Sequence, residues 1–405
     1  MLLALQFTAD VEEMKAACNV GVDECRRLLE RKRDEWKTIP MNVAVIGNSG
    51  VGKSSFINAM RGLSADDEGG ADVGVTETTL EIRSYPHPDN PKLLFWDLPG
   101  VGTNQYPKAS YLSDIKFDRY DVFLLMTAER FTENDTWLAK EIHKRNKKYV
   151  FVRSKIAVDI SNNKRSHPQT HKDEVVFETI RQSTADHLSK NGCGNVPMFL
   201  IDNYELIKFD FQKLTQQLFD DFPELKRSSL ILSMQSTSEQ LIRLKVAELR
   251  SRIWMCAALS GAVGFILDPG TSAKVDMAII SREAEFFLRQ LGLDSESLQR
   301  YARLYSVSYD EIQSIVKKEL GIEAELGTAT LRGIKTVVQI IIARLISLLP
   351  STAVEETARS FLPLIGSLIA APLSFAGTFV ALKLILDYFE KPAIEVMKFV
   401  ASRAD

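Results

Sequence analysis

The segment GNSGVGKS at residues 47–54 constrains the fold of this chain more than any other. It fits the pattern G-x-x-x-x-G-K-[ST], follows the β-branched run MNVAVIG and continues into SFINAMRG, which has helical character. A glycine-rich turn between a strand and a helix lets backbone N–H groups surround a phosphate, and the helix N-terminus adds positive field. We therefore expect a strand–loop–helix phosphate site, a P-loop, at this segment.

The residues of this loop predict individual contacts. Gly47, Gly50 and Gly52 allow a close backbone approach to the ligand. Lys53 can reach the β- and γ-phosphates, which makes it a catalytic as well as a binding candidate, and the Ser54 hydroxyl can ligate Mg²⁺. The nucleotide-binding assignments from the loop are Gly47, Gly50, Gly52, Lys53, Ser54 and Ser55.

A second motif, WDLPG at residues 96–100, supplies the remaining phosphate and metal candidates. Asp97 ends an apolar strand, where its carboxylate can hold Mg²⁺ through water, and Gly100 can present its N–H to the γ-phosphate. The intervening segment GADVGVTETTLE carries three threonines, of which Thr79 is assigned as the metal cap that acts when a γ-phosphate is present. Such a loop would be a nucleotide switch.

One catalytic group is absent from this pattern. Small GTPases of the Ras kind carry a glutamine that orients water just after the Gly of D-x-x-G, and here that residue is Val101. An isopropyl group cannot orient water, so hydrolysis by this chain is expected to be slow alone or to depend on another group.

Composition narrows the class of protein. The chain has 405 residues, of which 45% are apolar and 25% charged, as in ordinary globular domains. A net charge of −3 gives no electrostatic case for a nucleic-acid partner. None of the four cysteines forms a CxxC pair, and MLLALQFTAD is too short for a signal-peptide core and has Leu2 where myristoylation needs glycine. We expect reduced thiols and a cytoplasmic chain.

The order of elements predicts an α/β fold with helical flanks. Apolar, strand-like runs at 41–47, 93–98, 122–127, 149–154 and 197–202 alternate with helical stretches, and 77–85 reads as an extra edge strand. This alternation indicates a mainly parallel, doubly wound sheet. The predicted domains are N-terminal helices at 1–39 that end near Trp36, a P-loop domain at 40–222, and an all-helical domain at 223–405. Within the last, Ser308 with Glu311 predicts a capping box, and Asp294 predicts a helix N-cap.

Taken together, the motifs resemble those of the immunity-related GTPases, an interferon-inducible family of vertebrates. GNSGVGKSSFINAMRG, GVTETTLE, FWDLPGVGT, SKIAVD and FDFQKL occur in the family's order, and the similarity continues through FLRQLGLDSESLQRYARLY into the apolar C-terminal helices. Lys53 places the chain with the members that have lysine in the P-loop. The resemblance implies GTP/GDP and Mg²⁺ as ligands, nucleotide-dependent homo-oligomers formed through the G domains and with related GTPases, and peripheral association with intracellular membranes. It also implies that Glu77 assists hydrolysis across a G-domain dimer.

Two positions depart from the family pattern, both at the base and ribose end. The base-reading motif T-K-x-D is Ser154-Lys155-Ile156-Ala157 here, and the Ser-Asn after the last strand is Asp202-Asn203. Lys155 can still stack on the purine, and a backbone amide near Asp202 and Asn203 can read its O6. Without a carboxylate at 157 we expect GTP to be preferred over ATP only modestly, and Ala157→Asp should restore selectivity for GTP. Asp159 is a second, less direct source of a carboxylate.

The function predicted from the sequence is therefore a GTPase that is slow unless dimerised, oligomerises with nucleotide bound and is recruited to intracellular membranes, in cell-autonomous immunity. Two alternatives stay open. One is a non-hydrolysing nucleotide-binding regulator that pairs with active relatives, and the other is a base-indiscriminate NTPase.

The uncharged stretch at 360–382 is long enough to cross a bilayer. Proline and glycine residues at 363, 366, 372 and 377 interrupt it, which favours two short helices. Three interpretations remain open at this point: a buried hairpin, a segment that inserts reversibly into membranes, and a transmembrane span.

Overall fold

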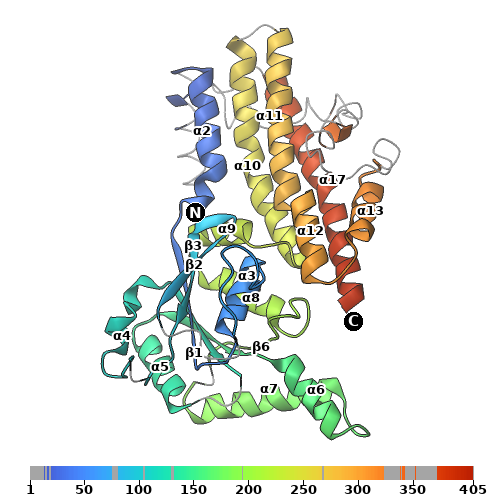
Figure 1. Ribbon diagram of the computed structural model, residues 1–405. Coiled ribbons are helices and arrows are strands. Elements are labelled where there is room, and N and C mark those ends of the chain that lie inside the picture. The colour runs from blue at the N-terminus through green and yellow to red at the C-terminus, as the bar shows by residue number, and fades with distance from the viewer. Residues whose placement is uncertain are drawn as a thin grey trace. The chain divides into compact units, whose positions relative to one another are not determined.

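The computed structural model describes residues 20–74, 81–103, 105–128, 132–193, 195–266, 269–322 and 372–404, with single positions at 13, 16, 17, 338, 340–342 and 352. The chain divides into two compact units. The G unit is Lys37–Thr237, and the helical unit combines Met1–Trp36 with Ser238–Asp405. Each is described below by itself (Figure 1).

A six-stranded sheet forms the centre of the G unit. Its strands are β1 (Met41–Gly47), β2 (Arg83–His87), β3 (Asn90–Leu98), β4 (Val122–Thr127), β5 (Lys148–Arg153) and β6 (Met198–Leu200), in the order β2-β3-β1-β4-β5-β6. All neighbours are parallel except β2 and β3. Strand β3 lies on one side of β1 and β4 lies on the other, so the strand order reverses at β1. Ligands of such sheets bind at the carboxyl ends of the strands beside this point. The predicted doubly wound P-loop fold with a helical domain is confirmed.

Helices cover both faces of this sheet (Figure 1). Alternate strand residues such as Ala44, Ile46 and Phe123 form one buried cluster with side chains from α4 (Tyr111–Asp114), the 3₁₀ turn Phe117–Arg119, α5 (Glu133–Lys144) and α7 (Asp173–Lys190). On the other face lie α3 (Lys53–Arg61) and α8 (Phe211–Asp221), whose Phe56 and Phe211 rings are 6.1 Å apart. Burial on both faces explains why the strands read as nearly continuous apolar runs.

The boundary predicted at residue 222 differs from the division seen in the structure. Helix α9 (Glu224–Ser233) falls inside the G unit. The Asn90 amide, at the start of β3, donates to the Ser233 hydroxyl of α9 at 2.9 Å and lies 3.4 Å from that of Ser229. These three polar groups are fully or almost fully buried, so α9 is fixed to the sheet. The boundary was predicted at residue 222 because a helix that follows the last strand and its helix cannot be told in sequence from the start of the helical domain.

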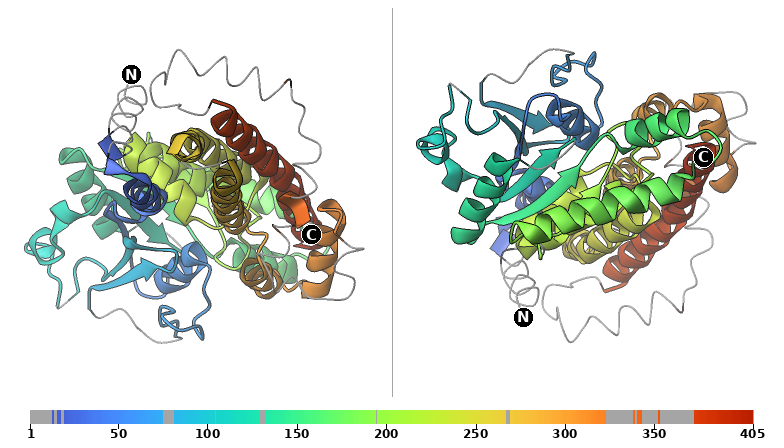
Figure 2. Two further views of the ribbon diagram at one scale, coloured as in Figure 1. Left: turned by 90° about the horizontal axis from the view of Figure 1, so that it is seen from above. Right: turned by 90° about the horizontal axis from the view of Figure 1, so that it is seen from below.

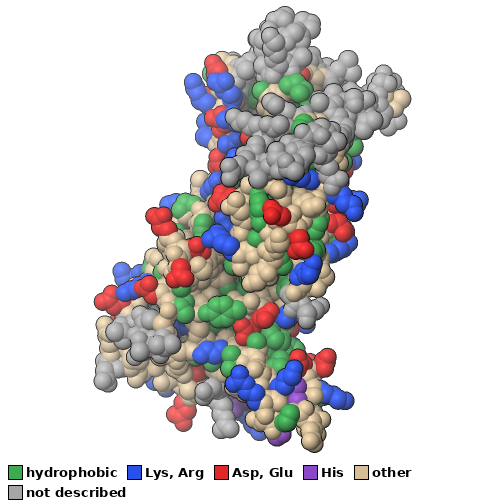
Figure 3. Space-filling view, turned by 45° about the vertical axis from the view of Figure 1, so that its right-hand side comes forward, with side chains coloured by type: hydrophobic (Ala, Val, Ile, Leu, Met, Phe, Trp, Pro, Cys, Tyr) green, Lys and Arg blue, Asp and Glu red, His purple; other side chains and the backbone are tan. Residues whose placement is uncertain are grey.

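The helical unit contains three long helices that lie side by side, α10 (Glu239–Ile266), α11 (Pro269–Gln290) and α17 (Pro372–Ala404) (Figures 1 and 2). Helix α2 (Val22–Asp34) packs against α10 and is followed by the 3₁₀ turn Glu35–Lys37, with Trp36 buried. The N-terminal helices predicted as a separate lead therefore group with the helical unit. In the face shown in Figure 3, acidic and basic side chains are interspersed.

Two shorter helices test the predicted caps. Asp294 accepts from the backbone N–H groups of Glu296 and Ser297 at the start of α12 (Ser295–Leu304), as predicted. At α13 (Tyr309–Glu319) the predicted capping box is wrong, because Ser308 makes no side-chain cap hydrogen bond. The Glu311 carboxylate pairs instead with Arg403 at 3.1 Å.

The apolar C-terminal stretch is partly described. Residues 360–371 lie outside the described residues, so the prediction of two short helices stays untested. From Pro372 onward the chain forms one helix, which Gly377 does not interrupt as predicted. A glycine in a helix interior costs roughly 1 kcal/mol, and burial of its neighbours Phe375, Ala376 and Thr378 offsets that cost. Within the described ranges, no helix combines the length and apolarity needed to cross a membrane.

Candidate nucleotide-binding site

The phosphate loop connects β1 to α3 in the geometry that the sequence predicts. Gly50 and Gly52 have φ of 78° and 90°, which a side chain rarely adopts, and Gly52 is the N-cap of α3. A Cβ on Gly47 would lie 2.2 Å from the carbonyl oxygen of Met126 on β4. The glycines at 47 and 52 are therefore required by packing and backbone conformation as well as by any ligand.

The first turn of α3 carries the two polar side chains of the motif. Lys53 is buried, and its Nζ donates to the carbonyl oxygens of Gly47 at 3.0 Å and Asn48 at 3.2 Å. The ammonium group therefore lies inside the loop, where it can exchange these carbonyl acceptors for phosphate oxygens. Ser54 Oγ donates to Asp97 Oδ2 on β3 at 2.8 Å, and both residues are buried.

The Ser54–Asp97 pair fits a magnesium site. A hydroxyl and a carboxylate are hard oxygen ligands, and the two come from the motifs that the sequence assigns to the metal. Among the described residues there is no group of three or more His, Cys, Asp or Glu that could hold a metal ion. Mg²⁺ bound with a nucleotide needs fewer protein ligands, because it keeps several waters and takes phosphate oxygens.

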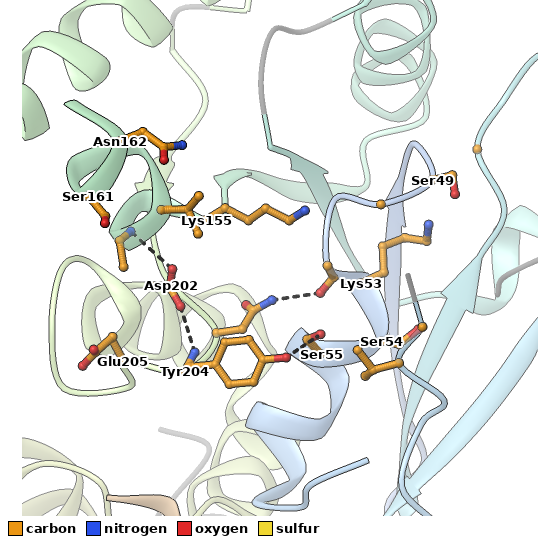
Figure 4. A pocket seen from close by; sticks show the side chains of 18 of the residues that line it. Ser49, Lys53, Ser54, Ser55, Lys155, Ser161, Asn162, Asp202, Tyr204 and Glu205 are labelled. Carbon is orange, nitrogen blue, oxygen red and sulfur yellow. Dashed lines mark hydrogen bonds between the residues drawn. The ribbon is translucent and has the colours of Figure 1, made fainter. Parts of the chain in front are cut away.

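A pocket of about 810 Å³ opens at the carboxyl ends of the strands (Figure 4). It brings together nine of the predicted site residues: Gly50, Gly52, Lys53, Ser54, Ser55, Gly100, Lys155, Asp202 and Asn203. Gly47 and Asp97 lie just behind the lining, bonded to Lys53 and Ser54. Glu77 and Thr79 lie outside the described residues.

The base end of the pocket is formed by the turns after β5 and β6. Lys155 is exposed and caps α6 (Ile156–Ser166) with φ of 61°. The Asp202 carboxylate accepts from the backbone N–H of Ala157 at 3.3 Å and from that of Tyr204 at 3.1 Å. Asn203 Nδ2 donates to the Gly52 carbonyl at 2.9 Å, so the turn after β6 is tied to the phosphate loop.

Asn203 presents a second polar atom that the surrounding protein does not satisfy. Its Oδ1 is buried and has no hydrogen-bond partner among the described residues. A buried acceptor without a partner is costly, and Asn203 lines the pocket. A ligand with a hydroxyl or N–H donor would satisfy it, which fits a nucleotide sugar or base.

The alternative carboxylate, Asp159, is not available to the pocket. Its Oδ2 pairs with Arg153 Nη2 at 2.6 Å, and Arg153 is almost fully buried at the end of β5. Asp159 is also absent from the pocket lining. Reading of a base by Asp159 would leave the buried guanidinium without this partner, so the structure argues against that hypothesis.

Several lining residues were not singled out from the sequence. Tyr204 is 75% exposed, and its hydroxyl lies 3.4 Å from Ser55 Oγ. In Figure 4 its ring lies between the labelled Asp202 and Ser55, with Lys155 across the pocket. Four others lie on the exposed face of α6, namely Val158, Ser161, Asn162 and Arg165, and Glu205 lies in the turn after β6. For these residues, the sequence offered one indication of a place in the pocket, which was the position of Tyr204 directly after Asp202-Asn203.

The turn after β3 shows why Val101 has no catalytic role. Its side chain is buried in the apolar cluster that packs against the sheet, and its carbonyl accepts from Asn134 Nδ2 at 2.9 Å. Tyr111 Oη donates to the Pro99 carbonyl at 2.6 Å, and burial raises the pKa of this phenol, which keeps it a donor. The turn thus holds Gly100 at the pocket while residue 101 faces the core.

Comparison with known proteins places this geometry in a family. The model of the interferon-inducible GTPase family matches residues 17–354. The mouse protein "Interferon-inducible GTPase 1" is 36% identical over 277 residues, which is 68% of this chain and 67% of the relative. The rat protein "Interferon-inducible GTPase 5" is 32% identical over 396 residues, covering 97% of this chain and 82% of the relative.

A solved structure of an oligomerised bacterial dynamin pair aligns with 98% of this chain and 75% of its own, at 12% identity and a TM-score of 0.32. That overall similarity is too low to support an argument about function. The family match covers most of the chain and includes both the P-loop and the turns that form the pocket. The chain therefore belongs to the interferon-inducible GTPase family, also called the immunity-related GTPases.

Proposed function

We propose that this protein binds GTP with Mg²⁺ in the pocket between the phosphate loop and the turns after β5 and β6, and hydrolyses it. The observation that carries the proposal is the convergence of Lys53, the Ser54–Asp97 pair and Lys155 on one pocket. Membership of a GTPase family supports the same conclusion.

Each part of the pocket has a role in this proposal. The amides of the phosphate loop and the N-terminus of α3 bind the phosphates, and Lys53 moves from the Gly47 and Asn48 carbonyls to the β- and γ-phosphates. Ser54 and Asp97 would hold Mg²⁺, which neutralises charge that develops on the transferred phosphoryl group. Gly100 presents its N–H to the γ-phosphate, and Lys155 stacks on the base.

The test is calorimetric titration of Lys53→Ala with GTP and Mg²⁺. Loss of charge-assisted contacts to two phosphates should weaken binding by about a hundredfold or more. Lys155→Ala is the matched control, because it removes a lysine at the other end of the pocket and should weaken binding far less. If Lys53→Ala binds GTP as tightly as the wild type, the phosphate-site assignment is wrong.

We further propose that hydrolysis depends on contact between G units. The residue after Gly100 faces the core, so the chain needs another group to orient water. The resemblance to the family assigns this role to Glu77 of a G-domain dimer. Three apolar side chains that line the pocket are exposed, namely Val73, Val158 and Tyr204, which supports a protein contact at this face.

Specific activity measured across a hundredfold range of protein concentration tests this dependence. It should rise with concentration, and Glu77→Ala should lower turnover while leaving the GTP dissociation constant nearly unchanged. Glu81→Ala removes a carboxylate nearby in the chain and serves as the control. Turnover that is constant per molecule over the whole range would contradict the dimer mechanism.

Recruitment to intracellular membranes from the cytoplasm is the third part of the proposal. It rests on the family resemblance, and the test is co-sedimentation of the full chain with liposomes in the presence of GTP or GDP. Sedimentation should depend on the nucleotide state. Equal, negligible sedimentation in both states would count against membrane recruitment by the protein alone.

The buried Val101 also favours a second candidate, a non-hydrolysing regulator that pairs with active relatives. Such a protein would bind GTP through the same pocket and release no phosphate at any concentration. Multiple-turnover phosphate release at the highest concentration of the dilution series separates the two functions.

A further inference from the structure

The two positions at which the sequence departs from the family motif are neighbours in the fold. Ala157 lies in the first turn of α6, after β5, and Asp202 lies in the turn after β6. Because β5 and β6 are adjacent parallel strands, their carboxyl ends meet. The backbone nitrogen of Ala157 is 3.3 Å from Asp202 Oδ2, so one departure removes a carboxylate and the other supplies one beside the vacated position.

We infer that Asp202 reads the guanine base in place of the missing carboxylate at residue 157. The inference rests on the proposed function and adds the determinant of its base specificity. A GTP-binding pocket would then keep its selectivity with the acidic group moved from α6 to the turn after β6. This differs from the modest selectivity expected from Ala157 alone.

The chemistry of the base edge fits a carboxylate at this place. Guanine presents two donors side by side, N1–H and the exocyclic amine on C2, whereas adenine presents an acceptor at N1, only a hydrogen on C2, and its amine on the opposite side of N1, at C6. Each oxygen of a carboxylate can accept two hydrogen bonds. Asp202 Oδ2 accepts one from Ala157 and Oδ1 accepts one from Tyr204, so both oxygens retain capacity for a ligand.

The position of Asp202 is fixed before a ligand arrives. The residue is 6% exposed, yet it lines the pocket, and two backbone N–H groups hold its carboxylate. The N-terminus of α6 adds a positive field that favours a negative charge there. Ala157 lines the pocket with a methyl group and offers no acceptor there, and Asp159 is bound to Arg153. Among the described residues that line the pocket, Glu205 is the only carboxylate besides Asp202.

A purely structural role for Asp202 is the competing explanation. A carboxylate that accepts from the first turn of α6 could serve only to cap that helix. Asparagine caps helices about as well as aspartate does. Asp202→Asn keeps one of the two backbone contacts, and the lost one costs about 1 kcal/mol under either explanation, while the pattern offered to a base changes from two acceptors to one acceptor and one donor.

This change of pattern makes xanthosine triphosphate a diagnostic probe. Xanthine carries N1–H beside a C2 carbonyl oxygen, which matches the acceptor and donor of an amide. The experiment compares dissociation constants of GTP, ATP and XTP for the full-length wild type and for Asp202→Asn, with Mg²⁺ present. The wild type should prefer GTP, whereas the variant should lose roughly 10- to 100-fold in GTP affinity and prefer XTP.

The outcomes separate this inference from the proposed function. If the wild type binds GTP and Asp202→Asn leaves the order of the three affinities unchanged, Asp202 only caps α6 and the inference is overturned. If the wild type binds none of the three nucleotides, the proposed function fails and the inference fails with it. A preference for GTP in the wild type that changes to a preference for XTP in Asp202→Asn supports both the proposed function and the inference.

A double-mutant cycle gives an independent test. Ala157→Asp places a second carboxylate beside Asp202, so it should weaken GTP binding rather than improve it, because two like charges repel in a partly buried site. Asp202→Ser should also weaken it, but the two changes together restore the family pattern and should recover affinity to within a few fold of the wild type. Additive losses in the double variant would overturn the inference.

Discussion

A methyl group at Gly52 should disturb the site in a way that the structure specifies. Gly52 has φ of 90°, and a Cβ placed on it would lie 2.9 Å from Asn203 Nδ2. That amide nitrogen donates to the Gly52 carbonyl at 2.9 Å and thereby joins the turn after β6 to the phosphate loop. In Gly52→Ala the amide has to move away, and this hydrogen bond is lost.

The expected loss has two parts. A side chain in the left-handed backbone region costs roughly 1–2 kcal/mol, and a broken hydrogen bond costs about another 1 kcal/mol. A total of about 2–3 kcal/mol should lower the melting temperature of the nucleotide-free protein by roughly 4–12 °C, given about 2–4 °C per kcal/mol for a unit of this size.

Gly50→Ala is the matched control for this prediction. Its φ is 78°, but a Cβ there would meet no atom within 4 Å, so it should carry only the backbone part of the cost. Thermal and urea unfolding of both variants, measured without nucleotide, give the comparison. Equal losses in the two variants would refute the assigned role of the Asn203 contact.

Three further variants test other parts of the molecule. Phe375→Asp buries an unpaired charge at a fully buried position of α17 and should unfold the helical unit. Lys383→Asp, at an exposed position of the same helix, should not. If Phe375→Asp stays folded and only loses binding to liposomes, Phe375 does not belong to the protein core. Burial raises the pKa of Glu283, so the folded state holds its proton more tightly and this group lowers stability as pH rises above its unfolded pKa. Glu283→Gln should therefore raise the melting temperature increasingly between pH 4 and pH 7, and a pH-independent difference would contradict this. Tyr204→Ala should weaken GTP and ATP binding by similar factors, which a changed GTP-to-ATP ratio would disprove.

The phosphate end of the site was predictable because its determinants are local in sequence. Gly47, Gly52, Lys53 and Ser54 act through the backbone conformation of one loop and the helix that follows it, so eight consecutive residues specify the geometry. The sheet was predictable for a related reason, because strands buried on both faces produce short apolar runs.

The base end was not predictable in the same way, because it depends on contacts between distant segments. The hydrogen bond from Ala157 to Asp202 joins residues that are 45 positions apart, and the Asn203–Gly52 contact joins residues 151 apart. No periodicity or local motif encodes such pairs. The sequence placed residues 224–233 in the helical domain for the same reason, since the buried Asn90–Ser233 contact that fixes α9 to the sheet spans 143 positions.

These differences predict that the two ends of the pocket tolerate change unequally. At the phosphate end a ligand would meet backbone N–H groups, and a Cβ on Gly47 would collide with the neighbouring strand, so no other residue can replace the glycine there without moving the loop. At the base end two turns at the carboxyl ends of adjacent strands line the same end of the pocket, and either can present a side chain to it. A carboxylate lost from the turn after β5 can thus be replaced from the turn after β6, as Ala157 and Asp202 illustrate. Specificity in such a pocket is a property of the pair of turns, and a motif read along only one of them would miss it.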